Sequence, residues 1–341
     1  MKDIITRLVE GRNLSRAEAE AAMATIMDGK ATPAQIGAFV TALRMKGETV
    51  EEITGFAAVM REKCALIAPR VAGPLIDTCG TGGAPVKTFN VSTISAFVAA
   101  GAGIAVAKHG NRAVTSTCGS ADVLETLGAN LALPPSEVQR VIEEVGVGFL
   151  FAPNFHPAMK HAAGPRREIG IRTVFNVLGP LTNPAGARHQ VIGVYHASLV
   201  QKLTQVLANL GAERALVVHG EGGLDEISPL GPTRIGQVLD GRVSYYTVNP
   251  EELGFRRIGA ADEVGGLDKE ASARVFLEVL ANREGPRRDM VLANAAAAAF
   301  VGGKAKDIKS GLDVARESLE SGRALGKLRA YVEATGGKFS G

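Results

Sequence analysis

The sequence predicts an α/β protein in which a small helical N-terminal domain precedes a large α/β domain with a mostly parallel central sheet. Three observations lead to this prediction. Apolar residues recur at helical spacing in residues 1–68, short β-rich runs alternate with helical stretches after Pro69, and glycine clusters follow several of those runs. The 341 residues, 46% of them hydrophobic, can fill sizeable cores in more than one domain.

Residues 1–68 are expected to form four amphipathic helices and no strand. Ile4, Ile5 and Leu8 give the first helix an apolar stripe, and Ser15 with Glu18 forms a capping box for the second. The third and fourth helices show the same features, a capping pair at the start of the helix or an apolar stripe along it. These are Thr32-Pro33 with Gln35, the apolar series Ile36, Phe39, Val40 and Leu43, and, after Thr49, the series Ile53, Phe56, Ala57 and Met60.

The chain beyond Pro69 contains six short β-rich runs separated by helical patterns, which is typical of a largely parallel sheet. The expected strands are Leu75–Ile76, Ile104–Ala107, Phe149–Phe151, Val191–Tyr195, Ala215–His219 and Val243–Val248. The C-terminal third is expected to be helical and to cover one face of that sheet. Its predicted helices are Lys269–Asn282, Arg288–Val301 and a long stretch from about Asp307.

Residues 153–186 interrupt this alternation, because they are helical in pattern, polar and punctuated by prolines. We expect them to leave the sheet and pack back on the N-terminal helices. The small domain would then comprise residues 1–68 with 153–186, and the large domain residues 69–152 with 187–341.

A first glycine loop, GTGG at Gly80–Gly83, lies between an expected strand and an expected helix. Glycines let backbone N–H groups approach an anion, and a helix N-terminus adds partial positive charge. Asn90, Ser92 and Thr93 offer side-chain donors at the same helix start. Either feature alone indicates only a tight turn or an N-cap, but together they favour a phosphate site.

A second loop, Lys108–Arg112 with the sequence KHGNR, follows the next expected strand, and a lysine at a strand's carboxyl end can act as a point charge on phosphate. Ser120 is a candidate N-cap for a helix Ala121–Leu127, with Gly128 as its C′ residue. Neither loop matches GxGxxG or GxxxxGK[ST], so the pair favours a polyphosphorylated substrate over a nicotinamide or ATP.

Adjacent carboxylates occur at Asp225-Glu226, in a glycine-containing loop after the strand Ala215–His219. An acid pair of this kind usually marks a solvated turn, and we expect the loop to be exposed. Its position on the same sheet edge as the two phosphate loops nevertheless makes it a candidate Mg²⁺ site, since hard oxygen ligands suit that ion.

Bulk properties exclude several classes of protein. A net charge of +3 and a pI near 8.7 are too weakly basic to demand nucleic acid, yet they suit a small anionic substrate. Cys64, Cys79 and Cys118 form no CxxC pair, which fits a reduced cytoplasm. No apolar run has the length of an uninterrupted membrane span, so we expect no membrane partner.

The motifs GTGG, TFNVST, KHGNR, CGSADVLE, HPAMKHA, RREIGIRT, NVLGPLTNPA and LDE, in this order, closely resemble those of the anthranilate phosphoribosyltransferase family over nearly the whole chain. The resemblance implies a nucleoside-phosphorylase-like phosphoribosyltransferase fold and a homodimer formed through the helical domains. It also implies Mg²⁺-dependent transfer of a phosphoribosyl group from phosphoribosyl pyrophosphate to anthranilate, a step of tryptophan biosynthesis.

The matching motifs also imply site residues, with Arg166 as the partner of the anthranilate carboxylate and no general base assigned. Phosphoribosyl pyrophosphate would be held by Gly80, Thr81, Gly82, Gly83, Thr88, Asn90, Ser92, Thr93, Lys108 and Ser120. Anthranilate would be held by Gly80, Asn111, His156, Arg166, Gly179 and Pro180. Magnesium would be held by Ser92, Asp225 and Glu226.

One departure and two alternatives accompany the resemblance. The family commonly continues GTGG with Asp-Gly, where this chain has Ala84-Pro85. A pyrimidine nucleoside phosphorylase-like enzyme would share the fold, but it calls for a segment like TGGTLDKLE where this chain has CGSADVLE. A non-catalytic nucleic-acid-binding relative is disfavoured by the retained Asp225-Glu226 and Arg166.

Overall fold

The computed structural model describes residues 1–113 and 117–341. Within them, one seven-stranded sheet has the strand order β3-β2-β1-β4-β5-β6-β7. The neighbours from β3 to β5 run parallel, and β6 and β7 complete the sheet with antiparallel pairing, so the predicted fold class is confirmed. The strands are β1 (Leu75–Gly80), β2 (Ala105–Gly110), β3 (Val147–Phe151), β4 (His189–Gly193), β5 (Arg214–Gly220), β6 (Thr233–Leu239) and β7 (Arg242–Val248).

Strand β6 was missed by the sequence analysis, because Gly236 breaks its β-rich pattern. A Cβ at this position would collide with Thr204 Oγ1 of the helix that packs on the strand. The turn between β6 and β7, by contrast, could have been predicted from the sequence. Asp240 and Gly241 have φ values of 49° and 75°, as a two-residue Asp-Gly hairpin turn requires.

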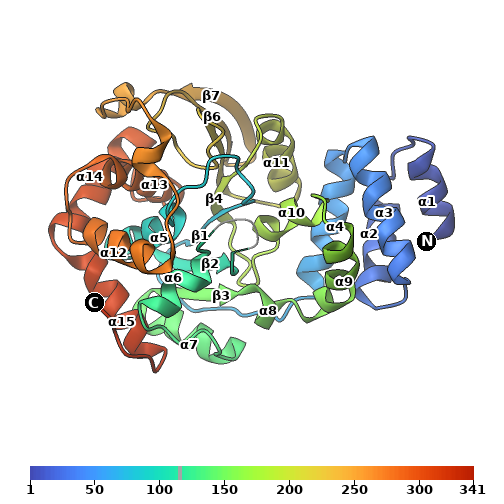
Figure 1. Cartoon of the computed structure of the whole chain (residues 1–341), viewed down its shortest axis with the longest axis horizontal. Helices are drawn as coiled ribbons and strands as arrows, with labels where there is room; N and C mark the ends of the chain where they lie inside the picture. Colours follow the sequence, from blue (N-terminus) through green and yellow to red (C-terminus); the bar gives the residue numbers. More distant parts are fainter. Residues whose placement is uncertain (114–116) are drawn as a thin grey trace.

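Four helices at the N-terminus form one end of the molecule (Figure 1). They are α1 (Lys2–Val9), α2 (Arg16–Met27), α3 (Pro33–Lys46) and α4 (Val50–Glu62). Capping boxes begin α2, α3 and α4, as the pairs Ser15/Glu18 and Thr32/Gln35 predicted for the first two. In the core of this unit the rings of Phe39 and Phe56 meet edge to face, with centroids 5.7 Å apart.

The chain between β3 and β4 leaves the sheet and returns to the N-terminal helices. It contains α8 (Ala152–Phe155), α9 (Lys160–Ile169) and α10 (Phe175–Leu178). α9 packs on α3 and α2, and α10 packs on α4. This apolar core continues through α11 (Ser198–Asn209) onto one face of the sheet. The division into domains at residues 68/69, 152/153 and 186/187 remains our proposal.

The two faces of the sheet carry different helices. Along β5, Leu216 and Val218 belong to the core beneath α5 and α13, whereas Ala215 and Val217 belong to the core beneath α11. The helices of the large unit besides α11 are α5 (Val91–Gly101), α6 (Ser120–Thr126), α7 (Pro135–Val145), α12 (Lys269–Leu280), α13 (Pro286–Val301), α14 (Ile308–Glu320) and α15 (Arg323–Ala334).

The helical stretch predicted from about Asp307 consists of two helices, α14 and α15, because Gly322 divides it. This glycine has a φ of 70° and serves as the N-cap of α15. The alanine run Ala295–Ala299 in α13 is buried, and a Cβ at Gly311 of α14 would clash with the α13 backbone there. Small residues therefore bring these two helices together. Within the described ranges, no helix combines the length and apolarity needed to cross a membrane.

We predict that Phe56→Ala destabilises the protein by about 3–5 kcal/mol, because it removes a fully buried ring and leaves a cavity against Phe39. Denaturant unfolding monitored by circular dichroism measures the change. Leu66→Ala is the control, since that side chain is 64% exposed and its loss should cost no more than about 0.5 kcal/mol. Equal effects of the two substitutions would contradict the packing described for α3 and α4.

Candidate active site

A cleft of about 380 Å³ opens at the carboxyl ends of β1 and β2, a volume within the range of small-molecule sites. Six residues between Arg166 and Pro180 of the returning segment and the Asp225-Glu226 loop also line it. Every residue assigned from the sequence motifs lines this cleft except His156. They are Gly80, Thr81, Gly82, Gly83, Thr88, Asn90, Ser92, Thr93, Lys108, Asn111, Ser120, Arg166, Gly179, Pro180, Asp225 and Glu226.

The first glycine loop is shaped by the close approach of Asp225. A Cβ at Gly80 would lie 2.8 Å from Asp225 Oδ2, and a Cβ at Gly193 would collide with the Asp225 backbone oxygen. Gly82 and Gly83 have φ values of 62° and 79°, which residues with a side chain rarely adopt. The backbone of Gly82 opposes the rise in the pKa of the Asp225 carboxyl group that burial causes. Glycine is therefore required here for both turn geometry and contact with the acid pair.

The N-terminus of α5 and the buried Lys108 form the floor beside this loop. Asn90 is the N-cap residue, and its Oδ1 is buried without a hydrogen-bond partner among the described residues. Lys108 Nζ donates to Thr78 O at 2.6 Å and to Ser92 Oγ at 3.4 Å. Burial lowers the pKa of Lys108, and the neighbouring Asp77 carboxylate opposes that shift. The cleft thus combines a helix N-terminus, an unsatisfied polar atom and a desolvated cation.

Asp77 and Asn183 hold the two loop-bearing strands together, and the sequence analysis missed both. The fully buried Asp77 carboxylate accepts hydrogen bonds from His109 N at 3.1 Å and from Asn183 Nδ2 at 2.8 Å. Asn183 Nδ2 also donates to Ala107 O at 2.8 Å. Burial is the main cause of the raised pKa of Asp77, and Lys108 opposes it. The one sequence feature that could have identified Asp77 is its position inside the apolar run LIDTC, where a charged residue is unexpected.

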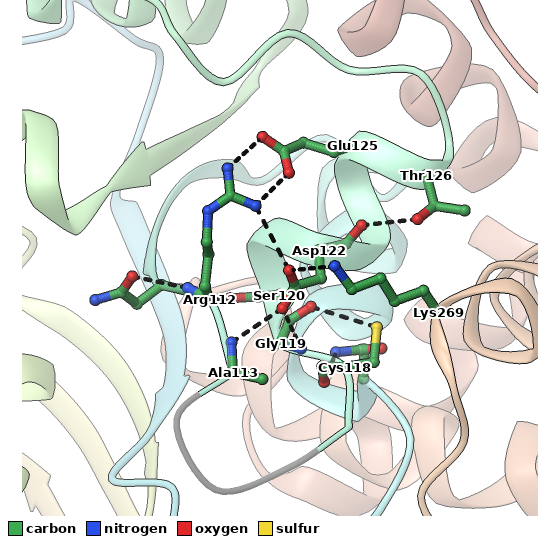
Figure 2. A network of polar contacts seen from close by, with 11 residues as sticks. Arg112, Ala113, Cys118, Gly119, Ser120, Asp122, Glu125, Thr126 and Lys269 are labelled. Carbon is green, nitrogen blue, oxygen red and sulfur yellow. Dashed lines mark hydrogen bonds and ion pairs between the residues drawn. The ribbon is translucent and has the colours of Figure 1, made fainter.

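Asp122 fastens the second loop, as Figure 2 shows. Its Oδ2 accepts hydrogen bonds from Ala113 N at 3.0 Å and from Gly119 N at 2.9 Å, so both ends of the connection before α6 are held. Arg112 adds a two-point bond to Glu125 and a contact of 3.5 Å to Asp122. The predicted N-cap at Ser120 is wrong, because Gly119 is the N-cap residue and Ser120 Oγ instead donates to Asn111 O.

A single later segment, Gly265–Lys269, ties both loops from outside the cleft. Gly265 forms a β-bridge with Thr88, and Gly266 N donates to Lys87 O at 2.6 Å. Thr117 Oγ1 donates to Leu267 O at 2.6 Å. Lys269 Nζ then lies 3.1 Å from Asp122 Oδ1, the contact drawn in Figure 2. The two loops are consequently parts of one connected structure. We call this segment the strap.

The acid pair is less exposed than the sequence predicted. Asp225 and Glu226 are half-buried, because the loop folds against Gly80 and Gly193. Thr88 Oγ1 donates to Glu226 Oε1 at 2.8 Å, while Glu226 Oε2 is buried with no partner in the described part of the chain. Burial raises the pKa of both carboxyl groups, and the adjacent Asp225 carboxylate raises that of Glu226 further.

These carboxylates suit a divalent cation, because it would satisfy the buried Glu226 oxygen and offset the repulsion within the pair. The described ranges contain no group of three or more His, Cys, Asp or Glu side chains placed to hold a metal. This donor set fits Mg²⁺, which is commonly held by one or two carboxylates together with water and substrate phosphates.

His109 and His156 form a buried pair behind the cleft. Their ring centroids are 5.0 Å apart, and only His109 lines the cleft. His109 Nδ1 lies 3.1 Å from Gly179 O, so Nδ1 carries the proton and Nε2 is the acceptor. Burial lowers the pKa of His109 to about 3 and that of His156 to about 4. Both imidazoles are therefore neutral at physiological pH.

The opposite side of the cleft presents arginine and aromatic side chains. Arg166 Cζ lies 5.0 Å from the centroid of the Phe175 ring, and burial lowers the pKa of Arg166. Across the described residues, this guanidinium has no carboxylate partner. Arg172, Phe175 and Tyr195 also line the cleft and were missed, since each lies outside the glycine and acidic patterns. An unpaired cation beside an aromatic face suits a planar carboxylate.

Comparison with known proteins gives consistent matches along nearly the whole chain. Residues 2–64 match the family described as "Glycosyl transferase family, helical bundle domain", and residues 72–325 match "Glycosyl transferase family, a/b domain". The anthranilate phosphoribosyltransferase of Acetivibrio thermocellus is 52% identical over 335 residues, which cover 98% of this chain and 96% of the relative.

Two solved structures extend the similarity to the fold. The anthranilate phosphoribosyltransferase of Thermus thermophilus has a TM-score of 0.92 and 42% identity, covering 98% of this chain and 99% of that one. The Saccharomyces cerevisiae enzyme, in complex with PRPP and Mg, has a TM-score of 0.89 and 29% identity, covering 98% and 97%.

We predict that the buried histidines make the fold sensitive to acid. The unfolded chain binds a proton near pH 6.5 that the folded His156, with its pKa of about 4, does not bind, so stability falls as pH decreases through this interval. His156→Gln should remove up to about 1.4 kcal/mol of that loss per pH unit. Denaturant midpoints between pH 7.5 and 4.5 measure the slope.

His196→Gln is the matched control for this slope, because that imidazole is exposed. It should leave the pH dependence of unfolding as in the wild type. Identical slopes for His156→Gln, His196→Gln and the wild type would show that the folded protein binds the His156 proton as readily as the unfolded chain does.

Proposed function

The chain belongs to the anthranilate phosphoribosyltransferase family, and we propose that its cleft transfers the 5-phosphoribosyl group from phosphoribosyl pyrophosphate to the amine of anthranilate. The products are N-(5′-phosphoribosyl)anthranilate and pyrophosphate. One observation carries the proposal: a single cleft joins two phosphate-type loops and a half-buried acid pair to an arginine that lies on an aromatic ring. The reaction belongs to tryptophan biosynthesis.

We expect the catalysis to come from the placement of the two substrates and from stabilisation of the charges that develop during the reaction. The bond from the ribose C1 to the pyrophosphate oxygen breaks while the anthranilate nitrogen bonds to that carbon and releases a proton. The Gly80–Gly83 loop, the α5 N-terminus and Lys108 would bind the phosphate groups, and Arg166 would bind the anthranilate carboxylate. An arylamine is neutral near pH 7, so we assign no general base. Correct orientation of the two substrates then accounts for most of the acceleration.

Magnesium would be held by Asp225 and Glu226, with Ser92 as a further oxygen donor from the α5 terminus. When bound, it neutralises pyrophosphate and so assists its departure. The chain itself contributes a pair of carboxyl groups that a cation relieves of their mutual repulsion and desolvation. The yeast enzyme's complex with PRPP and Mg supports the use of magnesium with this substrate.

We also propose a homodimer formed through the helical domain and a cytoplasmic location. Val9 of α1 and Met45 of α3 are 72% and 83% exposed, although both are large and apolar. All three cysteines are free, which suits a reducing compartment. Sedimentation velocity should report a dimer. A monomer at micromolar concentration would contradict the dimer proposal.

The direct test of function is the loss of anthranilate fluorescence upon addition of phosphoribosyl pyrophosphate and magnesium. Omission of either addition should leave the fluorescence unchanged. Phosphorolysis of thymidine or uridine without this loss would favour a nucleoside phosphorylase. Salt-dependent DNA binding without transferase activity would favour the nucleic-acid-binding alternative. Among the cleft residues that the structure describes, none favours either alternative.

We predict that Arg166→Ala raises the KM for anthranilate by roughly 10- to 100-fold, since a charge-assisted hydrogen bond is worth about 1.5–3 kcal/mol. The KM for phosphoribosyl pyrophosphate should change by less than about threefold, because only anthranilate presents its carboxylate to this group. The neighbouring Arg167→Ala is the control, as Arg167 is exposed and lies outside the cleft lining. Equal weakening of both substrates would assign Arg166 a structural role.

We predict that the double substitution Asp225→Asn with Glu226→Gln lowers kcat by about 100-fold or more, a typical cost of removing one preorganised electrostatic contact. Thermal stability should stay equal or increase, because two mutually repelling half-buried carboxyl groups become neutral. Magnesium titrations of activity and a thermal melt provide the two measurements. Glu221→Gln, in the same loop but exposed, should match the wild type in both. Unchanged magnesium dependence in the double variant would refute the metal assignment.

A further inference from the structure

We propose that Arg172 is a positioning residue that locks the first glycine loop in the conformation that receives the pyrophosphate group. This inference rests on the proposed function. Arg172 lies in the connection from α9 to α10, so it belongs to the segment that packs on the N-terminal helices. Its exposed guanidinium nevertheless reaches the loop at the end of β1 and lines the cleft.

Two contacts fix the Arg172 side chain. Its Nη2 donates to the Gly83 backbone oxygen, and its Cζ lies 4.6 Å from the centroid of the Tyr195 ring. Tyr195 is also tied to the same loop, because its backbone N donates to Thr81 Oγ1 at 3.2 Å. The guanidinium therefore lies between a flat aromatic platform and a carbonyl oxygen of the glycine loop, an arrangement that suits the planar arginine head better than lysine. We call this arrangement of Arg172, Tyr195 and the Gly83 oxygen the latch.

The Gly83 oxygen matters because of what a phosphate cradle requires. Backbone N–H groups must face the anion, and carbonyl oxygens must be turned away from it. Gly82 and Gly83 have positive φ values and no side chain, so little else restricts the orientation of the next peptide unit. In a trans peptide the C=O and N–H point in opposite directions. By holding the Gly83 oxygen, Arg172 turns the Ala84 N–H away from itself and prevents that peptide unit from rotating.

The latch also lies where two parts of the chain meet. Arg172 and Tyr195 line a second cavity, of about 230 Å³, together with Arg44 and Glu48 at the end of α3 and Lys202 of α11. One side of the latch thus borders the substrate cleft, and the other borders the junction between the N-terminal helices and the sheet. The conformation of the glycine loop consequently depends on the position of the returning helical segment.

The first measurement is hydrogen exchange in the substrate-free protein, which does not depend on activity. In the latched loop, Thr81 N donates to Gly193 O at 2.9 Å, so this amide is protected. Arg172→Ala should accelerate its exchange about tenfold or more, the effect of losing one charge-assisted bond. Unchanged exchange at the Thr81 amide would overturn the proposal.

A matched control is available at Arg214, which also stacks on an aromatic ring and donates to a backbone oxygen, both of Phe300, far from the cleft lining. Arg214→Ala should leave exchange at the Thr81 amide unchanged. Tyr195→Phe retains the ring and should exchange like the wild type. Tyr195→Leu removes the platform and should accelerate exchange, with no further acceleration when combined with Arg172→Ala. Full additivity of the last two substitutions would contradict a shared latch.

The second measurement is steady-state kinetics. Arg172→Ala should raise the KM for phosphoribosyl pyrophosphate about tenfold, with the KM for anthranilate within about twofold of the wild-type value. Faster exchange with an unchanged KM for phosphoribosyl pyrophosphate would show that the latch exists but does not position the loop for substrate, and would overturn the proposal. Inactivity of the wild type would refute the proposed function alone, because the exchange experiment would still decide the role of Arg172.

Discussion

The cleft depends on a carboxylate buried in the middle of the sheet. A charged group without water is costly unless hydrogen bonds and an opposite charge compensate it. Asp77 receives that compensation from the backbone of β2, from Asn183 and from Lys108. These partners come from separate parts of the chain, so the requirement to satisfy one buried group joins β1, β2 and the returning segment at the edge where the two loops emerge.

A second constraint is steric. Asp225 approaches β1 and β4 so closely that Gly80 and Gly193 cannot carry a side chain without displacing it. This contact places the acid pair Asp225-Glu226, which follows β5, against the first glycine loop. The pair remains incompletely satisfied, with Glu226 Oε2 lacking a partner among the described residues and its pKa raised by burial. The fold thus maintains a local electrostatic cost that a bound cation would relieve.

The sequence predicted the features that depend on local pattern. Capping boxes located α2 and α3, glycine clusters located both loops, and ordered motifs identified the family. All the residues that these motifs assigned to the site line the cleft except His156. Contacts between distant segments were not predictable in this way. Asp77 lies outside every motif, and the motif that contains Arg172 assigned this residue no role. The shielding of Asp225 follows from backbone packing, and Gly236 hid β6 because its role is to accommodate Thr204. His156 matched a motif, yet it packs behind His109.

The strap has a consequence for the order in which the site forms during synthesis. Both phosphate loops are made within the first 120 or so residues, but the segment that ties them, Gly265–Lys269, emerges from the ribosome about 150 residues later. At a typical elongation rate of roughly 5–20 residues per second, the loops wait on the order of ten seconds for their outer fastening. The nascent chain therefore passes through a stage in which β1 and β2 exist while the anion-binding edge is still loose.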